Sequence, residues 1–256
     1  YEILIGLVGS EMCIRDSHSG VGLLEKWMTT HYIKTASDII VLTQSFIPII
    51  EKRFGYSKEH IHYMPHGRMS TYKQQNTTAP QTDCKNINFL FFGRIEEYKG
   101  LHILGKAYKK LVQSYSNISM TVAGSGDFSK YDSMFKELPQ VDIVNRYIED
   151  KEIDNYFSIP NTILVLPYLD ASQSGVIPVA LEYKIPIIAS DAGGLKEQMN
   201  NGDFGLFFQP GNANALMQQM EYAVKHPEFL AIEKKKMAEY LKTLNWDVVT
   251  RKVIQI

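Results

Sequence analysis

The sequence predicts an α/β protein built on a doubly wound parallel sheet. Short apolar runs of four to six residues alternate with helical segments, and glycine-rich or charged turns follow several of these runs. Runs of this length are typical of strands buried on both faces, and their alternation with helices predicts parallel strands. Such sheets bind ligands at the carboxyl ends of their strands, so the residues that follow each strand are the candidate functional residues.

Residues 18–67 are predicted to be the last part of one domain. The elements expected there are, in order, a helix over 21–37, a strand over 38–43, a helix over 45–54 that stops at Gly55, and a strand over 60–64. Residues 68–86 are polar and contain a proline, and we interpret them as a linker.

Residues 87–243 are predicted to form a second, nearly complete domain. The expected strands cover 88–92, 118–123, 141–144, 162–166, 187–189 and 205–208. The expected helices cover 99–115, 128–137, 151–157, 176–183, 212–225 and 227–243, with one short helix after Gly194. The run Glu233–Lys236 is interpreted as a solvated helix face, with a weak membrane-surface patch as the alternative. Residues 244–256 would begin a tail that returns to the first domain, with Trp246 either docking there or filling a core.

The first 17 residues stand apart from this pattern. Residues 10–17 have neither helical nor strand periodicity, and the string LVGSEMCIRDS resembles a peptide found at the ends of many unrelated translated assemblies. We therefore expect residues 1–17 to be a non-native segment. The alternative is a genuine strand and loop of unusual composition.

The composition excludes several classes of protein. The 256 residues are 45% hydrophobic, which allows one large domain or two small ones. With 27 basic and 28 acidic residues the net charge is −1, so a nucleic-acid partner is not expected. Two cysteines exclude a disulfide scaffold, and no apolar run is long enough to span a bilayer. The seven histidines are scattered, although His60 and His62 alternate along a predicted strand, so one of them should face the core. We expect a cytoplasmic protein with no metal site and no cofactor.

The first candidate cluster follows the strand over 88–92. In Phe92–Gly100 the glycine Gly93 permits a tight turn, Arg94 offers a bidentate grip on a phosphate, and Lys99 adds a point charge near a helix start. The alternative is a surface loop with two solvated cations.

The second cluster, Gly124 and Gly126, permits close approach of a ligand or forms an ordinary tight turn, and the sequence does not separate these interpretations.

Two more clusters follow later strands. In Asp170–Pro178, small residues expose backbone N–H groups, and Ser172 and Ser174 either bind phosphate or cap the next helix. The fourth cluster contains Gly193 and Gly194. Because the carboxyl ends of parallel strands lie at one edge of a sheet, all four clusters should meet there. The sequence therefore predicts one site for an anionic ligand that carries a nucleotide.

Taken together, the clusters resemble the carboxyl-terminal domain of GT-B glycosyltransferases of group 1, also called family four. The segments that carry the resemblance are FGRIEEYKG, VAGSGDF, ASQSGVIPVALEYKIPIIASDAGGLKEQ and, at the end of the first domain, HIHYMPHG. The resemblance covers about residues 30–256. It implies two Rossmann-like domains, of which residues 18–67 are the remnant of the acceptor domain and 87–243 the nucleotide-sugar domain.

The resemblance also implies an activity and roles for particular residues. The family transfers a sugar from a nucleoside diphosphate sugar to an acceptor hydroxyl with retention, and the SQSGVIP form resembles enzymes of surface-polysaccharide assembly. Arg94 and Lys99 match the catalytic pair that neutralises the leaving diphosphate. The donor-binding residues expected from the loops and the resemblance together are Gly93, Gly124, Gly126, Tyr147, Ile148, Asp170, Ser172, Ser174, Gly175, Gly193, Gly194 and Glu197. The implied acceptor is a saccharide or a lipid-linked molecule, with possible peripheral membrane contact of the longer protein.

The third cluster departs from the family pattern. Many members carry two glutamates eight positions apart there, but in this chain Val179 occupies the position of the second. Asp170 is a candidate for the first, and Glu182 would serve as the second only with a different helix register. Two alternatives therefore stay open: a non-catalytic nucleotide-sugar-binding subunit, and another GT-B enzyme such as a nucleotide-sugar epimerase. A fragment of this extent is expected to bind donor weakly and not to turn over alone.

Overall fold

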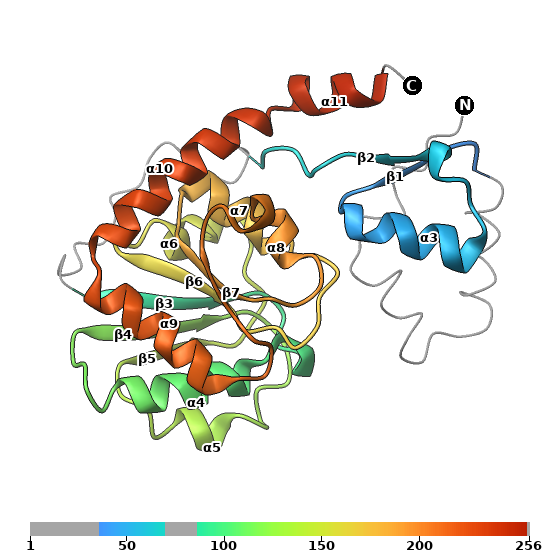
Figure 1. Cartoon of the computed structure of the whole chain (residues 1–256). Helices are drawn as coiled ribbons and strands as arrows, with labels where there is room; N and C mark the ends of the chain where they lie inside the picture. The colour runs from blue at the N-terminus through green and yellow to red at the C-terminus, as the bar shows by residue number, and fades with distance from the viewer. Residues whose placement is uncertain (1–35, 70–85, 255–256) are drawn as a thin grey trace.

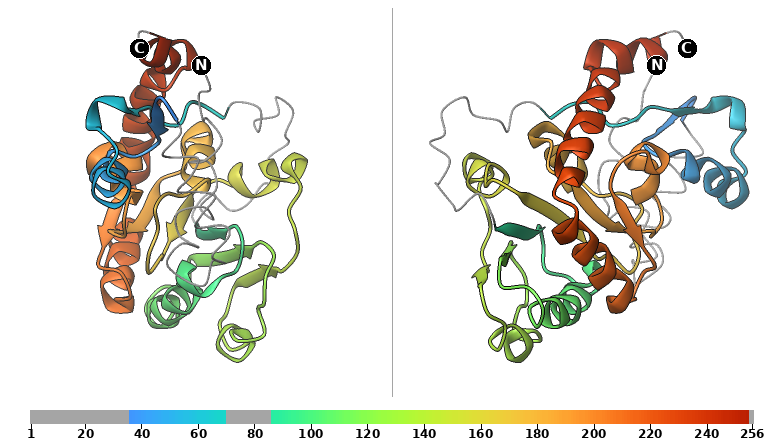
Figure 2. Two further views of the ribbon diagram at one scale, coloured as in Figure 1. Left: turned by 90° about the vertical axis from the view of Figure 1, so that its right-hand side faces the viewer. Right: turned by 60° about the vertical axis from the view of Figure 1, so that its left-hand side comes forward.

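The computed structural model describes residues 36–69 and 86–254, which form a small and a large α/β unit (Figure 1). The proposed non-native segment 1–17, most of the helix predicted over 21–37 and most of the linker lie outside the described residues. The right-hand view of Figure 2 shows the small unit beside the large one, with helix α10 rising along the large unit toward α11.

The small unit is a two-stranded parallel sheet covered by one helix. Strand β1 (Ile39–Val41) pairs with β2 (Ile61–Tyr63), and between them lie the 3-10 helix η1 (Gln44–Phe46), helix α3 (Ile47–Phe54) and the 3-10 helix η2 (Lys58–His60). Gly55 ends α3 with a φ of 65°, as the sequence predicts. Ala36 and Ser37, which we expected to end a helix, are not helical.

The expectation that His60 or His62 faces the core is wrong. His60 lies in η2 with its side chain more than half exposed, and His62 is only partly buried. Both imidazoles lie against the same oxygen of Asp38, at 3.2 Å for His60 Nδ1 and 2.9 Å for His62 Nε2. Because η2 ends before the strand begins, the two residues do not share the strand alternation that the sequence indicated.

The large unit is built on six parallel strands in the order β5-β4-β3-β6-β7-β8. These strands are β3 (Ile87–Phe92), β4 (Ile118–Ala123), β5 (Val141–Val144), β6 (Thr162–Leu166), β7 (Ile187–Ser190) and β8 (Leu206–Phe208). Their positions agree with the predicted strands to within a residue or two. Strand β3 pairs with β4 on one side and β6 on the other, so the chain winds outward from the middle in both directions.

Helices cover both faces of this sheet, because alternate residues of each central strand point to opposite faces. In β3, Phe89 and Phe91 join one buried cluster and Leu90 joins the other. The remaining helices are η4 (Glu97–Lys99), α4 (Leu101–Leu111), α5 (Asp132–Phe135), η5 (Asp150–Glu152), α6 (Asp154–Phe157), α7 (Val176–Tyr183), α8 (Leu195–Gln198), η6 (Asn200–Gly202), α9 (Ala213–Lys225), α10 (Glu228–Thr243) and α11 (Trp246–Ile254). Helices α4 and α9 lie on one face, whereas α7 and α8 lie on the other.

Three of the predicted helices are shorter than expected or are interrupted. The helix expected over 99–115 becomes η4 and α4, because Gly100 takes a left-handed φ of 67° between them. The helix expected over 128–137 is reduced to the single turn α5. The helix expected over 151–157 is split into η5 and α6.

The charged run Glu233–Lys236, in the middle of α10, is not wholly a solvated face. Glu233 is buried, and its carboxylate accepts a hydrogen bond from the Gly205 N–H and pairs with Lys236 at 3.3 Å. A buried carboxylate needs such partners. The bond from Gly205 also holds α10 to the loop before β8. Lys234 and Lys235, by contrast, are exposed.

Two adjacent segments join the units. The N–H of Arg68 donates to the carbonyl of Leu244 at 3.0 Å, and the indole N–H of Trp246 donates to the carbonyl of Arg68 at 2.9 Å. Beyond Trp246, helix α11 places Val249 in a buried cluster with Ile40 and Met64 of the small unit. The domain boundaries expected from the sequence stay predictions.

Candidate functional site

Four loops meet at the carboxyl edge of the large sheet, as the sequence predicts. The clusters around Arg94, Gly124, Ser174 and Gly193 follow β3, β4, β6 and β7, which are neighbours in the order β4-β3-β6-β7. Because these strands are parallel, their carboxyl ends lie side by side. The sheet therefore gathers into one place residues that lie about a hundred positions apart in the chain.

Glycines let the first two loops pack backbone against backbone. A Cβ on Gly124, whose φ is 149°, would overlap the carbonyl oxygen of Gly93. The same holds for Gly126 against the carbonyl of Ile95, whose N–H donates to Ser125 O at 2.7 Å. The close approach that these glycines permit in this structure is to the neighbouring loop, and the approach of a ligand stays a prediction.

The other two loops pack in the same way. A Cβ on Gly193 or Gly194 would overlap the carbonyl oxygen of Ala171 or Ser172, respectively. The Gly194 N–H also donates to the carbonyl of Ala171 at 3.1 Å. The Gly-Gly turn is therefore required for close packing against the loop that follows β6.

The two predicted catalytic cations differ in environment. Arg94 is exposed and pairs with Glu96 at 3.1 Å. Lys99 is only 5% exposed, and its Nζ lies 5.3 Å from the centre of the Tyr168 ring. The position of a Cβ on Gly93 would be 3.3 Å from that Nζ, so the ammonium group lies directly beside the turn after β3. A buried cation held over an aromatic ring can stabilise negative charge that forms beside it.

The loop after β6 holds the predicted phosphate-binding serines. Ser174 Oγ accepts a hydrogen bond from the Val176 N–H at 3.3 Å and shares another with the Tyr168 hydroxyl at 3.2 Å. The N-cap residue of α7 is Gly175, which has no side chain, so the Ser174 hydroxyl binds the first N–H group of the helix from one residue further back. The Ser174 N–H, which we expected to face a phosphate, donates instead to Gln198 Oε1 at 2.6 Å. Gly175 is exposed, Ser172 is partly buried and Asp170 is exposed.

The residues expected beside the base lie after the edge strand β5. Tyr147 is 71% exposed, whereas Ile148 is buried. The preceding Arg146 donates to both carboxylate oxygens of Glu152, at 2.6 and 2.8 Å, and to the carbonyl of Tyr147 at 3.0 Å. This bidentate pair fixes the loop, and it lowers the pKa of Glu152 to about 2, with a smaller contribution from the Glu149 N–H.

Two glutamates bind other parts of the protein. Glu197, expected to contact the donor, accepts hydrogen bonds from the N–H groups of Gln44 and Ser45, the latter at 3.2 Å. Glu182 accepts two hydrogen bonds from Arg68, at 3.0 and 2.9 Å. Glu182 therefore holds the segment between the units, and in the observed register of α7 it does so in place of binding the donor.

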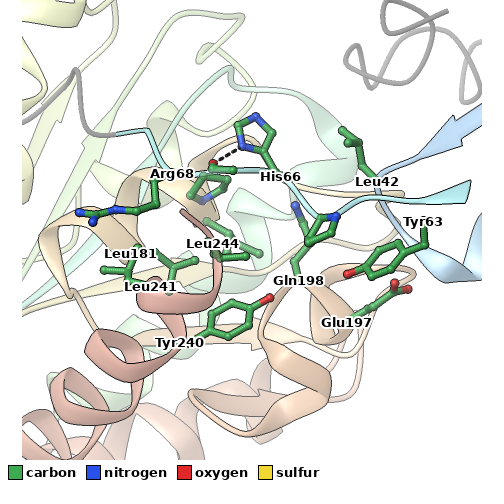
Figure 3. Close-up of a pocket in the computed structure, with 14 residues that line it drawn as sticks. Leu42, Tyr63, His66, Arg68, Leu181, Glu197, Gln198, Tyr240, Leu241 and Leu244 are labelled. Atoms are coloured by element: carbon green, nitrogen blue, oxygen red, sulfur yellow. Dashed lines mark hydrogen bonds between the residues drawn. The ribbon is translucent and has the colours of Figure 1, made fainter. Parts of the chain in front are cut away.

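A small cavity lies between this segment and the large unit (Figure 3). Tyr63 and His66 line it from one side, and Glu197, Gln198 and Tyr240 from the other. Its volume of about 30 Å³ holds a water molecule but not a nucleotide. Burial, followed by nearby Tyr240 and Glu197, raises the pKa of Tyr63 to about 12, so this phenol stays protonated at neutral pH.

Sequence inspection missed Gln198 and Arg68. Both are polar residues whose partners lie far away in the chain, and no local motif marks them.

Across residues 36–69 and 86–254, no three His, Cys, Asp or Glu side chains are grouped so that they could hold a metal ion. In the same part of the chain, no helix has the length and hydrophobicity needed to cross a membrane.

Comparison with known proteins identifies the family. The model of the family "Glycosyl transferases group 1" matches residues 73–243, about two thirds of the chain and all four loops. The chain belongs to this family. Its group 1 glycosyltransferase relatives include the alpha-D-kanosaminyltransferase of Streptomyces kanamyceticus, which is 20% identical over 227 residues, covering 84% of this chain and 57% of that protein.

Solved structures show the same GT-B fold. Sucrose-phosphate synthase from Thermosynechococcus elongatus superposes with a TM-score of 0.74 at 19% identity, covering 97% of this chain and 63% of the other. HepE of Anabaena, in complex with UDP-glucose, gives a TM-score of 0.75 at 16% identity, covering 94% of this chain and 68% of the other. This group 1 chain spans between 38% and 57% of the length of the curated relatives that it matches.

Proposed function

We propose that the protein to which this chain belongs transfers a sugar from a nucleoside diphosphate sugar to an acceptor hydroxyl, with retention at the anomeric carbon. The observation that carries the proposal is the family match, because it spans the four loops that lie together at one edge of the sheet. The solved HepE complex with UDP-glucose supports a uridine nucleotide as the first donor to test. A saccharide or lipid-linked acceptor, as in surface-polysaccharide assembly, follows from the sequence resemblance alone.

The chemistry proposed for the donor loops is charge neutralisation. The bond between the anomeric carbon and the diphosphate oxygen breaks, and its electron pair leaves with the diphosphate. Lys99 and Arg94 stabilise that charge, which is the kind of contribution that accounts for most of many enzymes' rate enhancement. The acceptor oxygen forms the new bond to the anomeric carbon, and its proton passes to the departing diphosphate. In this proposal the two cations stabilise the charge on the leaving diphosphate without a bound metal ion. We therefore expect the transferase activity to be unchanged in the presence of EDTA.

The remaining donor residues have positioning roles. Ile148, with the backbone at Tyr147, would hold the base at the β5 end of the site, and the Gly175 N–H would bind a phosphate at the start of α7. Asp170 is the exposed carboxylate nearest in sequence to this phosphate loop and is proposed to bind the sugar hydroxyls.

The experiment is isothermal titration of the whole chain with UDP, GDP and UDP-glucose. The test variant is Arg94→Ala/Lys99→Met, and the control is Lys109→Ala/Lys225→Ala, which removes two exposed cations elsewhere. We expect the test variant to bind at least about tenfold more weakly and the control to match the wild type. Equal binding by both variants, with folding confirmed by circular dichroism, would contradict the proposed diphosphate site.

A second candidate is a non-catalytic nucleotide-sugar-binding subunit. It is favoured by the absence of the second of the two glutamates that many family members carry. Val179 occupies the position of that second glutamate, and Glu182 is bound to Arg68. Release of nucleoside diphosphate by the longer protein, dependent on acceptor and lost in Lys99→Met, would exclude this candidate. Donor binding without any turnover would support it.

A further inference from the structure

The side chain of Gln198 holds one residue of the phosphate loop by both of its backbone groups. Its Oε1 accepts from the Ser174 N–H at 2.6 Å, and its Nε2 donates to the Ser174 carbonyl at 3.3 Å. The amide thus pairs with Ser174 as a neighbouring strand would. Gln198 is the last residue of α8 and lies 24 positions away, so this contact joins the loops after β6 and β7.

The contact with the Ser174 carbonyl restrains the direction of the next N–H group, together with the Ile177 N–H, which donates to the same carbonyl at 3.4 Å. The carbonyl of Ser174 and the N–H of Gly175 belong to the same peptide group, which is planar and trans, so they point in opposite directions. With the carbonyl turned toward Gln198, the Gly175 N–H points away from α8. Gly175 is exposed, and a Cβ placed on it would meet no atom within 4 Å, so there is open space beside this residue.

The Gly175 N–H is also the unused donor at this helix start. Among residues 174–177, the N–H of Ser174 donates to Gln198, that of Val176 to Ser174 Oγ and that of Ile177 to the Ser174 carbonyl. Gly175 has no such acceptor among the described residues. The amino end of α7 therefore presents the Gly175 N–H as its oriented donor, because Gln198 takes the Ser174 N–H.

We propose that Gln198 is a positioning residue that aims the Gly175 N–H at the distal phosphate of the donor. The inference rests on the proposed function, because it names the group that orients the phosphate contact of that same site. Gln198 itself does not touch the donor. Its bond to the Ser174 carbonyl orients the peptide group that does, and its bond to the Ser174 N–H fixes the preceding peptide group, so that little order has to be gained when the diphosphate binds.

The test compares a nucleoside diphosphate with its monophosphate. The whole chain is titrated with UDP and UMP, or with GDP and GMP if only guanine nucleotides bind. The ratio of the two dissociation constants measures the distal phosphate alone. The variants are Gln198→Leu, which keeps the approximate shape and removes both hydrogen bonds, and Gln198→Glu, which keeps an acceptor for Ser174 N–H but faces the carbonyl with a second acceptor. Gln218→Leu, an exposed glutamine on α9, is the control.

We expect the preference for diphosphate to fall about tenfold in Gln198→Leu, with monophosphate binding unchanged within about twofold. Gln198→Glu should lose the same preference, because the carbonyl contact sets the peptide direction, and Gln218→Leu should lose none of it. Amide hydrogen exchange at Ser174 should accelerate in Gln198→Leu.

Two results overturn the inference. An unchanged ratio in Gln198→Leu would show that the contact is structural only. Tighter diphosphate binding would show that Gln198 competes with the phosphate for the Ser174 N–H. If the wild type binds no nucleotide at all, the proposed function itself fails. If the wild type and Gln198→Leu bind nucleotide and prefer the diphosphate equally, only the role of Gln198 fails.

Discussion

Glu182 and Arg68 form a bidentate ion pair across 114 residues of sequence. The carboxylate side chain is 3% exposed and the guanidinium 41%. Glu182 lies on α7, the helix that begins at the phosphate loop, and Arg68 lies in the segment between the two units. The pair thus connects the donor side of the large unit to the segment that carries the small one.

Removing Arg68 should therefore destabilise the protein. Arg68→Ala leaves a buried carboxylate without its partner, and we expect the free energy of unfolding to fall by about 2–3 kcal/mol, less than for a fully buried pair because Arg68 is partly solvated. Urea denaturation measures the loss. The control is Lys109→Ala in the exposed pair with Glu137, where the change should be below about 1 kcal/mol. Equal effects at the two sites would contradict a structural role of the buried pair.

The Gly-Gly turn after β7 should not tolerate a side chain. In Gly193→Ala the Cβ overlaps the Ala171 carbonyl oxygen at a left-handed φ of 51°, and we expect a loss of about 2–4 kcal/mol. Gly175→Ala is the matched comparison, since its φ of −66° is ordinary and the space around it is open, so stability should change by less than about 1 kcal/mol. Thermal unfolding of the two variants checks the contrast, and similar melting temperatures would refute it.

The stability of the loop that carries Tyr147 should depend on pH in the acidic range. The folded pKa of Glu152 is about 2, below its ordinary 4.5, so the stabilisation is fully present above pH 4.5 and is lost as the pH falls toward 2. Arg146→Ala should raise the pKa of Glu152 toward 4.5, leaving only the smaller effect of the Glu149 N–H. Carboxyl-carbon NMR titration of Glu152 in both proteins is the measurement. An unshifted Glu152 in the wild type would mean that the ion pair does not form in solution.

Glu197 should stabilise the start of the helical segment in the small unit. Its carboxylate binds the first N–H groups of that segment, at Gln44 and Ser45, where the N-cap residue Thr43 supplies no side-chain bond. We expect Glu197→Ala to cost about 0.5–2 kcal/mol, as for loss of a helix cap. Amide hydrogen exchange at Gln44 and Ser45 should accelerate in this variant and stay unchanged in Lys196→Ala, a neighbour on α8. No change in either variant would argue against the cap.

The strands were predictable because each is decided by local sequence. The apolar runs in β3, β4, β6 and β7 are buried on both faces, and the turns that follow them contain the glycines that make the loops visible in the sequence. The helix ends were less predictable, because Gly100 interrupts a helix for a reason that lies elsewhere. A Cβ there would overlap the carbonyl of Pro167, which follows β6.

The location of the site in the fold was predictable from the sequence, but the hydrogen bonds of its residues were not. The four loops were expected at one edge because parallel strands end at the same edge of a sheet, but the use of the Ser174 N–H by Gln198 depends on two side-chain bonds between separate loops. Glu197 and Glu182 were both considered for the donor because a motif or a spacing drew attention to them. Their partners, Gln44 and Arg68, come from a part of the chain that no local pattern connects to them.

The paired segments at Arg68 and Leu244 act as a joint crossed twice by the same chain. Their mutual hydrogen bonds, from Arg68 N–H to Leu244 and from Trp246 to Arg68, connect the two crossings to each other. A movement that separates the two crossings would break both bonds. The hydrogen bonds therefore hold the two crossings together as one connection between the units.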